Sequence, residues 1–306
     1  MEVKDWTYEE FRNYDEKVEG ATRISTSGNE VGVTYIPNVV YSNADDIPVT
    51  LQILKPYTRN CPQKICPLVV YVQGSAWLEQ NVYMNLPQLA KLAARGYVIA
   101  VVQYRHSGQA AFPAQIQDAR TAVRFMRVHA EEYGVDVEHV IMAGDSSGGH
   151  TAVFAGMGEP ERYLGEEPYS HVSAEVDGII DLYGSVSVLE EDANPSTINH
   201  CLPDSPEGML AGGVNLRENQ ELRERISAVT YITPEKEMPP MLIMHGTKDF
   251  VVNTEQSVKL YEKLKSCDKD AELYLIDGAM HGGPEFWTDQ VLDIMDEFIK
   301  RCVDKV

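Results

Sequence analysis

The chain has 306 residues, 43% of them hydrophobic and 24% charged, which is the composition of a globular protein with a large core. Its 47 acidic side chains outnumber 26 basic ones, and the formal net charge of -21 argues against binding to nucleic acid or to anionic membranes. The sequence has no run of 18 apolar residues, and its charged start, MEVKDWTYEE, lacks the apolar region of a signal peptide, so we expect neither a membrane span nor export.

Short apolar runs alternate with longer amphipathic segments along most of the sequence. The runs LVVYV (68–72) and YVIAVV (97–102) are brief, rich in valine and bounded by turn residues, as buried parallel strands are. Between them, leucine and alanine recur at helical spacing over 86–93. A proline at the start of 113–133 opens a second amphipathic segment, which we expect to be helical throughout.

The same alternation continues to the C-terminal region. The other strands expected are 139–144, 176–184, 241–246 and 271–277, and the other helices are one from about Ser147, 254–266 and 287–302. Strands at 33–36 and 48–54 are expected to form an antiparallel edge. A long succession of strand, helix and strand predicts a mostly parallel sheet with helices on both faces. The predicted fold class is therefore α/β, as a single domain over residues 1–306.

Two segments do not follow this pattern. Residues 185–230 lack clean periodicity and contain many Pro, Asn, Asp and Gly residues, over a length far beyond the roughly 2–6 residues of an ordinary connection. We expect them to form a lid-like insertion above the strand ends. Residues 1–30 carry Trp6, Tyr8 and Phe11, and we expect this segment either to cap the site or to pack on the body of the domain.

The five cysteines are scattered, and no two of them form a CxxC pair. This arrangement favours a reduced, cytoplasmic protein with incidental thiols. Cys61 and Cys66 are close enough in sequence to bridge a loop, and that disulfide is the less favoured alternative.

The stretch Gly144-Asp145-Ser146-Ser147-Gly148 matches G-x-S-x-G, with a predicted strand before it and a predicted helix after it. A serine at such a turn has a strained backbone, and side chains two residues to either side would collide with neighbouring elements, so glycine is needed at both places. Centring the pattern on Ser147 would require glycine at 145. Ser146 is therefore the candidate nucleophile, although the pattern alone also fits a phosphate-binding turn or a serine-capped helix start.

A serine nucleophile needs a base, and the base needs an acid that orients it, in the chain order Ser, Asp or Glu, His for this turn. His281, in DGAMHGG, is the best candidate base because it follows a predicted strand on a glycine-flanked loop. The other histidines after the serine are less suitable. His150 lies on the next helix, His171 and His200 lie in or beside the irregular segment, and His245 ends a strand.

Two aspartates compete for the role of the acid. Asp249, in HGTKDFVV, lies just beyond strand 241–246, and Asp277 ends the next strand, four residues before His281. Asp277 would have to share a narrow loop with the histidine, whereas Asp249 can approach the imidazole from the side. Asp249 is therefore preferred, and Asp277 is the runner-up.

The loop Gln73-Gly74-Ser75-Ala76-Trp77 follows the predicted strand 68–72 and consists largely of small residues. Backbone N–H groups in such a loop can stabilise a developing oxyanion. We assign this role to the N–H of Gly74 or Ser75, together with that of Ser147 at the helix start. The candidate substrate-binding side chains are Trp77 and Trp287.

These residues together resemble the α/β-hydrolase esterases related to hormone-sensitive lipase, and most closely the bacterial feruloyl- or acetyl-xylan-esterase-like group. The resemblance spans roughly residues 30–302 and rests on FPAQIQDARTAVRFMRVHAEEYGVD, GDSSGGH, SPEGMLAGG, MHGTKDFVV and GAMHGGPEFW. It implies a triad of Ser146, Asp249 and His281. The sequence departs from the family at the oxyanion loop, where His-Gly-Gly-Gly-Trp is usual, because Ser75 and Ala76 add bulk there.

The sequence therefore predicts a serine carboxylesterase that forms an acyl-enzyme on Ser146 and acts on small esters, with acetylated or feruloylated sugars implied by the resemblance. Two other functions share this scaffold: a serine exopeptidase, which commonly carries a large extra domain, and a ligand-binding protein such as the plant gibberellin receptor, which has lost the catalytic histidine. No cofactor or metal is expected, since a ligand cluster such as H-E-x-x-H is absent. The expected partner is a small ester, with no nucleic acid or membrane, and a homo-oligomer is left open.

Overall fold

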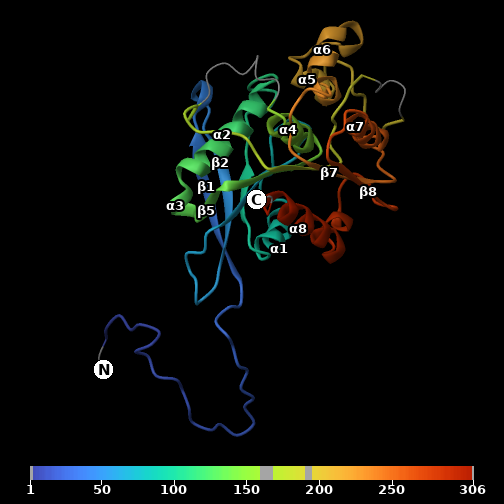
Figure 1. Ribbon diagram of the computed structural model, residues 1–306. Helices are drawn as coiled ribbons and strands as arrows, with labels where there is room; N and C mark the ends of the chain where they lie inside the picture. Colours follow the sequence, from blue (N-terminus) through green and yellow to red (C-terminus); the bar gives the residue numbers. More distant parts are fainter. Residues whose placement is uncertain (1–2, 159–167, 190–194, 305–306) are drawn as a thin grey trace.

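The computed structural model describes residues 3–158, 168–189 and 195–304, which form an eight-stranded sheet with helices on both faces (Figure 1). The strands are β1 (Gly32–Ser42), β2 (Val49–Tyr57), β3 (Cys66–Val72), β4 (Val98–Val102), β5 (Val135–Asp145), β6 (Gly178–Leu182), β7 (Met241–Gly246) and β8 (Ala271–Ile276). They lie in the order β1-β2-β4-β3-β5-β6-β7-β8. Strands β3 to β8 run parallel, whereas β2 is antiparallel to β1 and β4. The predicted α/β class and antiparallel edge are confirmed.

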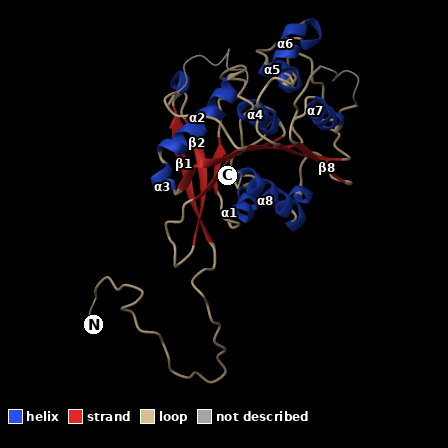
Figure 2. Ribbon diagram, in the orientation of Figure 1, coloured by secondary structure: helices blue, strands red, loops and turns tan. Residues whose placement is uncertain are grey.

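Helices cover the two faces of the sheet as separate layers (Figure 2). One layer contains α2 (Ala114–Val128), α4 (Ser147–Gly156) and α7 (Glu255–Ser266), and the other contains α1 (Leu86–Ala93) and α8 (Asp289–Val303). Each layer has its own buried apolar cluster against the sheet. The protein therefore has a three-layer architecture with two hydrophobic cores.

Strand β3 shows why the central strands are continuous apolar runs. Val70 and Val72 pack with the α2 and α4 layer, whereas Val69 and Tyr71 pack with the α1 and α8 layer. Side chains alternate between the faces of a sheet, so a strand covered on both faces needs an apolar residue at nearly every position. Each valine buried in this way contributes roughly 2 kcal/mol to folding.

The parallel strands bring three predicted site residues to one edge of the sheet. Strand β5 ends at Asp145, β7 at Gly246 and β8 at Ile276. Because the carboxyl ends of parallel strands share an edge, the loops after these strands lie side by side. Ser146, Asp249 and His281 lie on those three loops.

Two predicted elements differ in length from the structure. The helix expected over 113–133 is divided into α2 and α3 (Ala130–Tyr133), because His129 leaves the helical region with φ -101° and ψ 24°. The ring of His129 stacks on Phe125 with 4.3 Å between ring centroids. Strand β6 is shorter than the expected 176–184, because Tyr183 turns the chain with φ 45°.

The segment 185–230 contains short helices rather than a plain loop. These are α5 (Pro206–Leu210), α6 (Gln220–Arg225) and the 3-10 turns Leu216–Glu218 and Ala228–Tyr231. Its residues 190–194 lie outside the described residues. The backbone N–H of Thr197 donates to the carbonyl oxygen of Phe250 at 2.8 Å, which ties the segment to the loop after β7. A role as a lid stays a prediction.

Most of the N-terminal segment lies apart from the rest of the structure, and its role stays a prediction. Residues 3–30 lead away from the sheet and its helices (Figure 1). Trp6, Tyr8 and Phe11 are 45%, 65% and 66% exposed. Tyr8 stacks on Arg59, in the turn between β2 and β3, with 4.6 Å between the guanidinium carbon and the ring centroid. The end of the segment also contacts the body, where the carbonyl oxygen of Gly28 accepts from the N–H of Asn60 at 3.0 Å.

The alternative disulfide between Cys61 and Cys66 is not formed. All five cysteines are free thiols, and Cys61 is exposed whereas the other four are buried.

Candidate active site

Ser146 occupies the sharp turn between β5 and α4. Its backbone has φ 53° and ψ -124°, a conformation that residues other than glycine rarely adopt. The flanking glycines are required by packing. A Cβ at Gly144 would lie 2.3 Å from the carbonyl oxygen of Gly148, and one at Gly148 would lie 2.0 Å from that of Val72. Any larger residue at either position would displace the turn.

Ser146, His281 and Asp249 are joined by hydrogen bonds. Nε2 of His281 lies 2.8 Å from Oγ of Ser146, and Nδ1 lies 2.7 Å from Oδ2 of Asp249. Because a carboxylate can only accept, Nδ1 carries the proton and donates it to Asp249. Nε2 is then left to accept a hydrogen bond from the serine hydroxyl. In this tautomer the imidazole is ready to take the proton of Ser146.

The carboxylate of Asp249 is buried and surrounded by donors. Its Oδ1 accepts hydrogen bonds from the backbone N–H groups of Val251 and Val252 at 2.8 and 3.0 Å. Its Oδ2 accepts from His281 and, at 3.1 Å, from Nε2 of His245. Burial by itself raises the pKa of Asp249, but the hydrogen bonds from His245 and His281 outweigh it and hold the pKa well below its usual range. Asp249 therefore stays charged even in acid.

The structure brings none of the other candidates to Ser146. Asp277 is exposed and lines a different pocket, between β8 and α8. Nε2 of His150 donates to the carbonyl oxygen of Ile226 at 2.9 Å, and burial lowers the pKa of His150 to about 4. His150 is thus a neutral core residue that ties α4 to the segment 185–230.

The loop after β3 offers a different oxyanion donor from those expected. The N–H of Gly74 donates to Oδ1 of Asp145 at 3.0 Å, and the N–H of Ser75 donates to Oγ of Ser147 at 2.9 Å. No hydrogen bond among the described residues uses the N–H of Ala76 or of Ser147. Ala76 has φ 57°, which turns the loop at this point. The structure therefore leaves the N–H groups of Ala76 and Ser147 as available donors, and it engages those of Gly74 and Ser75 elsewhere.

A cluster of hydroxyl groups holds this loop, and sequence reasoning missed it. The hydroxyl of Tyr104 lies 2.9 Å from Oγ of Ser75 and 3.3 Å from Oγ of Ser147. Oγ of Ser75 also donates to the carbonyl oxygen of Leu78 at 2.6 Å. Burial raises the pKa of Tyr104 to about 12, so its hydroxyl stays protonated at neutral pH. Tyr104 follows the predicted strand 97–102, at the edge where site residues are expected, and this position was the available signal.

Ser146 and His281 line a pocket of about 600 Å³. Gly74, Ser75 and Ala76 form one wall, and Trp287 lines the pocket as well. The remaining lining residues are Met84, Asn85, Gln88, Asp145, Tyr183, Val251, Gly282, Gly283 and Pro284. Trp77 is not among them, because its side chain is buried against His150 with 5.0 Å between the ring centroids. Of the two predicted substrate-binding tryptophans, the structure brings only Trp287 to this pocket.

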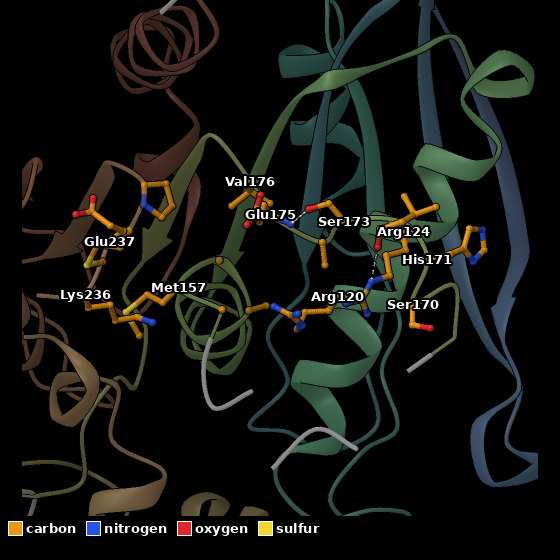
Figure 3. Close-up of a pocket in the computed structure, with 17 residues that line it drawn as sticks. Arg120, Arg124, Met157, Ser170, His171, Ser173, Glu175, Val176, Lys236 and Glu237 are labelled. Atoms are coloured by element: carbon orange, nitrogen blue, oxygen red, sulfur yellow. Dashed lines mark hydrogen bonds between the residues drawn. The ribbon is translucent and has the colours of Figure 1, made fainter. Parts of the chain in front are cut away.

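Figure 3 shows a second pocket, of about 620 Å³. It lies at the amino ends of β6 and β7, whereas Ser146 and His281 lie beyond the carboxyl ends of the strands that precede them. Its walls include Val176 and Pro239, which precede β6 and β7, and Arg120 and Arg124 of α2. None of the predicted site residues lines it.

The described part of the chain holds no group of three or more His, Cys, Asp or Glu side chains placed to bind a metal ion. Among the helices it describes, none is both long and apolar enough to cross a membrane.

Comparison with protein families finds a match to the BD-FAE model over residues 51–264, more than half of the chain. Among curated proteins, the esterase LipC of Mycobacterium tuberculosis is 28% identical over 227 residues, which cover 73% of this chain and 55% of LipC. The chain spans about half the length of the curated relatives it matches.

Three solved structures, of two esterases, are similar over nearly their whole length. A truncated carbohydrate esterase from gut microbiota has a TM-score of 0.79 and 26% identity, covering 91% of this chain and 99% of that one. Esterase 2 of Thermogutta terrifontis with bound butyrate has a TM-score of 0.68 and 25% identity, covering 89% of this chain and 94% of that one. A further structure of the same enzyme, phosphonylated by sarin, has a TM-score of 0.70 at 25% identity, covering 92% of this chain and 98% of that one.

Proposed function

The chain belongs to the BD-FAE family of α/β-hydrolases, and from that premise we propose that it is a serine carboxylesterase whose acyl-enzyme forms on Ser146. The observation that carries the proposal is the hydrogen-bonded series Asp249, His281 and Ser146, at 2.7 and 2.8 Å, in which Ser146 and His281 line a pocket. The esterase relatives and structural neighbours support the same reaction class.

In the first half of the proposed reaction, Oγ of Ser146 attacks the ester carbonyl carbon while Nε2 of His281 takes its proton. The carbonyl oxygen becomes an oxyanion, which accepts hydrogen bonds from the N–H groups of Ala76 and Ser147. The C–O bond to the alcohol then breaks, and His281 returns the proton to the leaving alkoxide. The buried, charged Asp249 stabilises the imidazolium during this step.

In the second half, a water molecule attacks the acyl group on Ser146, and His281 takes the proton of that water. A second oxyanion forms and collapses with release of the carboxylic acid. The proton on His281 returns to Oγ of Ser146, which restores the starting state. Atoms balance as one ester and one water giving one acid and one alcohol.

The proposed substrates are small esters with a short acyl group. Ser75 and Ala76 narrow the pocket beside the acyl carbon, where glycine would leave more room. Asn85 and Gln88 supply polar groups, and Met84 and Trp287 supply apolar surface, for the alcohol part of the ester. Acetylated or feruloylated sugars are the proposed class of natural ester, supported by the carbohydrate esterase among the structural neighbours.

We also propose that residues 1–306 act as one domain, in which the lid-like segment 185–230 borders the substrate site from behind the loop after β7. Nε2 of His200 lies 3.0 Å from the carbonyl oxygen of Val251, and Val251 lines the pocket. A substrate longer than the pocket would therefore meet this segment next.

The test is a panel of nitrophenyl acetate, butyrate and octanoate, acetylated xylo-oligosaccharide and methyl ferulate, with wild-type protein and Ser146→Ala. We expect kcat/KM to be highest for the short nitrophenyl esters and to fall by about 10³-fold or more in Ser146→Ala. A fluorophosphonate probe should label Ser146 with loss of activity. Hydrolysis that survives Ser146→Ala, or labelling confined to Ser147, would overturn the proposed mechanism.

A further inference from the structure

A second histidine contacts the acid of the proposed triad. His245 is the fifth residue of β7, and its side chain is wholly buried. Its Nε2 lies 3.1 Å from Oδ2 of Asp249 and 3.0 Å from the carbonyl oxygen of Val252. Both neighbours are acceptors, so Nε2 must carry a proton and donate it.

The other ring nitrogen fixes the charge of His245. Nδ1 lies 2.6 Å from Oγ of Ser257, a wholly buried residue of α7. In the described part of the chain that hydroxyl has no other hydrogen-bond partner, so it donates its proton to Nδ1. His245 is therefore neutral, with its single ring proton on Nε2.

Two imidazole N–H groups thus converge on one carboxylate oxygen. Oδ2 of Asp249 accepts from His281 at 2.7 Å and from His245 at 3.1 Å, while Oδ1 is held by backbone N–H groups. Without the second imidazole, Oδ2 would lose one of its two donors, and its position relative to the ring of His281 would be less tightly fixed. The negative charge of Asp249 would also stabilise the protonated form of His281 more strongly.

We propose that His245 is a positioning residue that fixes the direction and tempers the charge of Asp249, and so sets the orientation and basicity of the catalytic base His281. The inference rests on the proposed function, because it deepens the role of the same triad. Asp145 and Tyr183 are the other titratable groups that face this pair, and both stay unchanged in the variants below.

A purely structural histidine would behave differently from a positioning one. Its loss would lower stability, and any folded variant would keep the pH profile of the wild type. A positioning histidine affects the pH profile of kcat/KM as well, because removal of its N–H increases the charge of Asp249 on His281. The acidic limb of the profile should then move to higher pH.

The side-chain amides offer a matched pair of variants. In His245→Gln the amide nitrogen can occupy the place of Nε2, whereas in His245→Asn the same group is too short to reach Oδ2 of Asp249. We expect His245→Asn to lower kcat about tenfold with KM nearly unchanged, and to raise the acidic limb by about half a pH unit, with His245→Gln close to wild type. Equal kcat values and equal pH profiles for the two variants would overturn the proposal.

A measurement on the unaltered protein covers the case in which these variants do not fold. With ¹⁵N-labelled histidine, NMR at neutral pH should show His245 as the neutral Nε2–H tautomer. In Ser257→Ala, Nδ1 of His245 loses the hydroxyl that donates to it, so the Nε2–H tautomer should no longer be the single form observed. In the wild type, an Nδ1–H tautomer or a doubly protonated ring for His245 contradicts the proposed role. If the wild type hydrolyses no ester while the tautomer is as expected, the proposed function fails and the contact with Asp249 stands.

Discussion

Ser146 has φ 53° and ψ -124°, a backbone conformation that glycine adopts readily and that a residue with a β-carbon adopts only with strain. Replacing the serine by alanine keeps that β-carbon and its strain, whereas glycine removes both. We therefore expect Ser146→Gly to be more stable than Ser146→Ala by about 1 kcal/mol, while both variants lack esterase activity. Thermal unfolding of the two proteins measures the difference, and an equal or lower Tm for Ser146→Gly would contradict it.

The two aspartates near the end of the chain provide a second test at the scale of single residues. Asp249 hydrogen-bonds to His281, whereas Asp277 is exposed beside another pocket. Asparagine at 249 favours the wrong tautomer of His281, so we predict that Asp249→Asn lowers kcat by about 10²–10⁴-fold. Asp277→Asn should cost less than about tenfold, which corresponds to roughly 1.4 kcal/mol in the barrier. Steady-state kinetics on both variants, with circular dichroism as the control for folding, decide the assignment, and the reverse order would make Asp277 the acid.

At the scale of elements, the packing of β6 against α4 encloses the carboxyl group of Asp181. Asp181 is wholly buried in β6, and its Oδ1 accepts from the N–H of Gly184 at 3.0 Å. Within the described residues its Oδ2 has no hydrogen-bond partner. Burial raises the pKa of Asp181 to about 7, which the hydrogen bond from Gly184 only partly offsets. The folded protein therefore favours the protonated form.

The sign of the effect on stability follows from that pKa. Below about pH 3.9, the ordinary pKa of an aspartate, Asp181 is protonated in both the folded and the unfolded protein, and the free energy of unfolding does not depend on its titration. As pH rises to 7 the unfolded chain releases the proton and the folded one retains it, so stability falls by about 1.4 kcal/mol per pH unit. We predict that Asp181→Asn raises Tm relative to wild type at pH 8 and changes it little at pH 4. A Tm difference that does not vary with pH would show that Asp181 does not titrate in this way.

The oxyanion loop leads to a prediction about acyl length. Ala76 lines the pocket beside Ser146. For the wild type, kcat/KM should fall from butyrate to octanoate esters, and Ala76→Gly should raise the octanoate-to-acetate ratio severalfold, since one methyl group is worth about 1–3 kcal/mol in a pocket. Octanoate hydrolysed faster than acetate by the wild type would contradict the narrow pocket.

Apolar runs and glycine spacing were enough to predict the strands, the order of the site residues and the turn at Ser146. Three features were beyond them. The proposed oxyanion donor, the N–H of Ala76, depends on which way each peptide group of the loop faces. Gly74, Ser75 and Ala76 are all small residues with a backbone N–H, so the sequence does not show which of these groups is available. The end of α2 depends on the backbone of His129, whose stacking on Phe125 no periodicity reveals. The sequence places His245 at a strand end, but it does not reveal that Asp249, four residues later, folds back onto the ring of His245.

At the scale of the whole molecule, most of the N-terminal segment lies apart from the sheet and its helices (Figure 1). Deletion of residues 1–26 keeps Gly28, whose carbonyl oxygen accepts from the N–H of Asn60 at 3.0 Å. We expect the deletion to change Tm by less than about 2 °C and to leave kcat/KM for nitrophenyl acetate unchanged, because it removes exposed side chains. A large loss of activity would mean that the segment reaches the pocket in solution.

The separation of the triad along the chain has a consequence for refolding. Ser146 and His281 are 135 positions apart, and the loops that carry them are aligned only when β6, β7 and β8 have joined the sheet beside β5. Local helices form early, whereas pairing of distant strands is slow. After dilution from denaturant, the far-ultraviolet signal should therefore recover before turnover does. Recovered catalysis would report the last stage of sheet closure, and the lag between the two signals would time it.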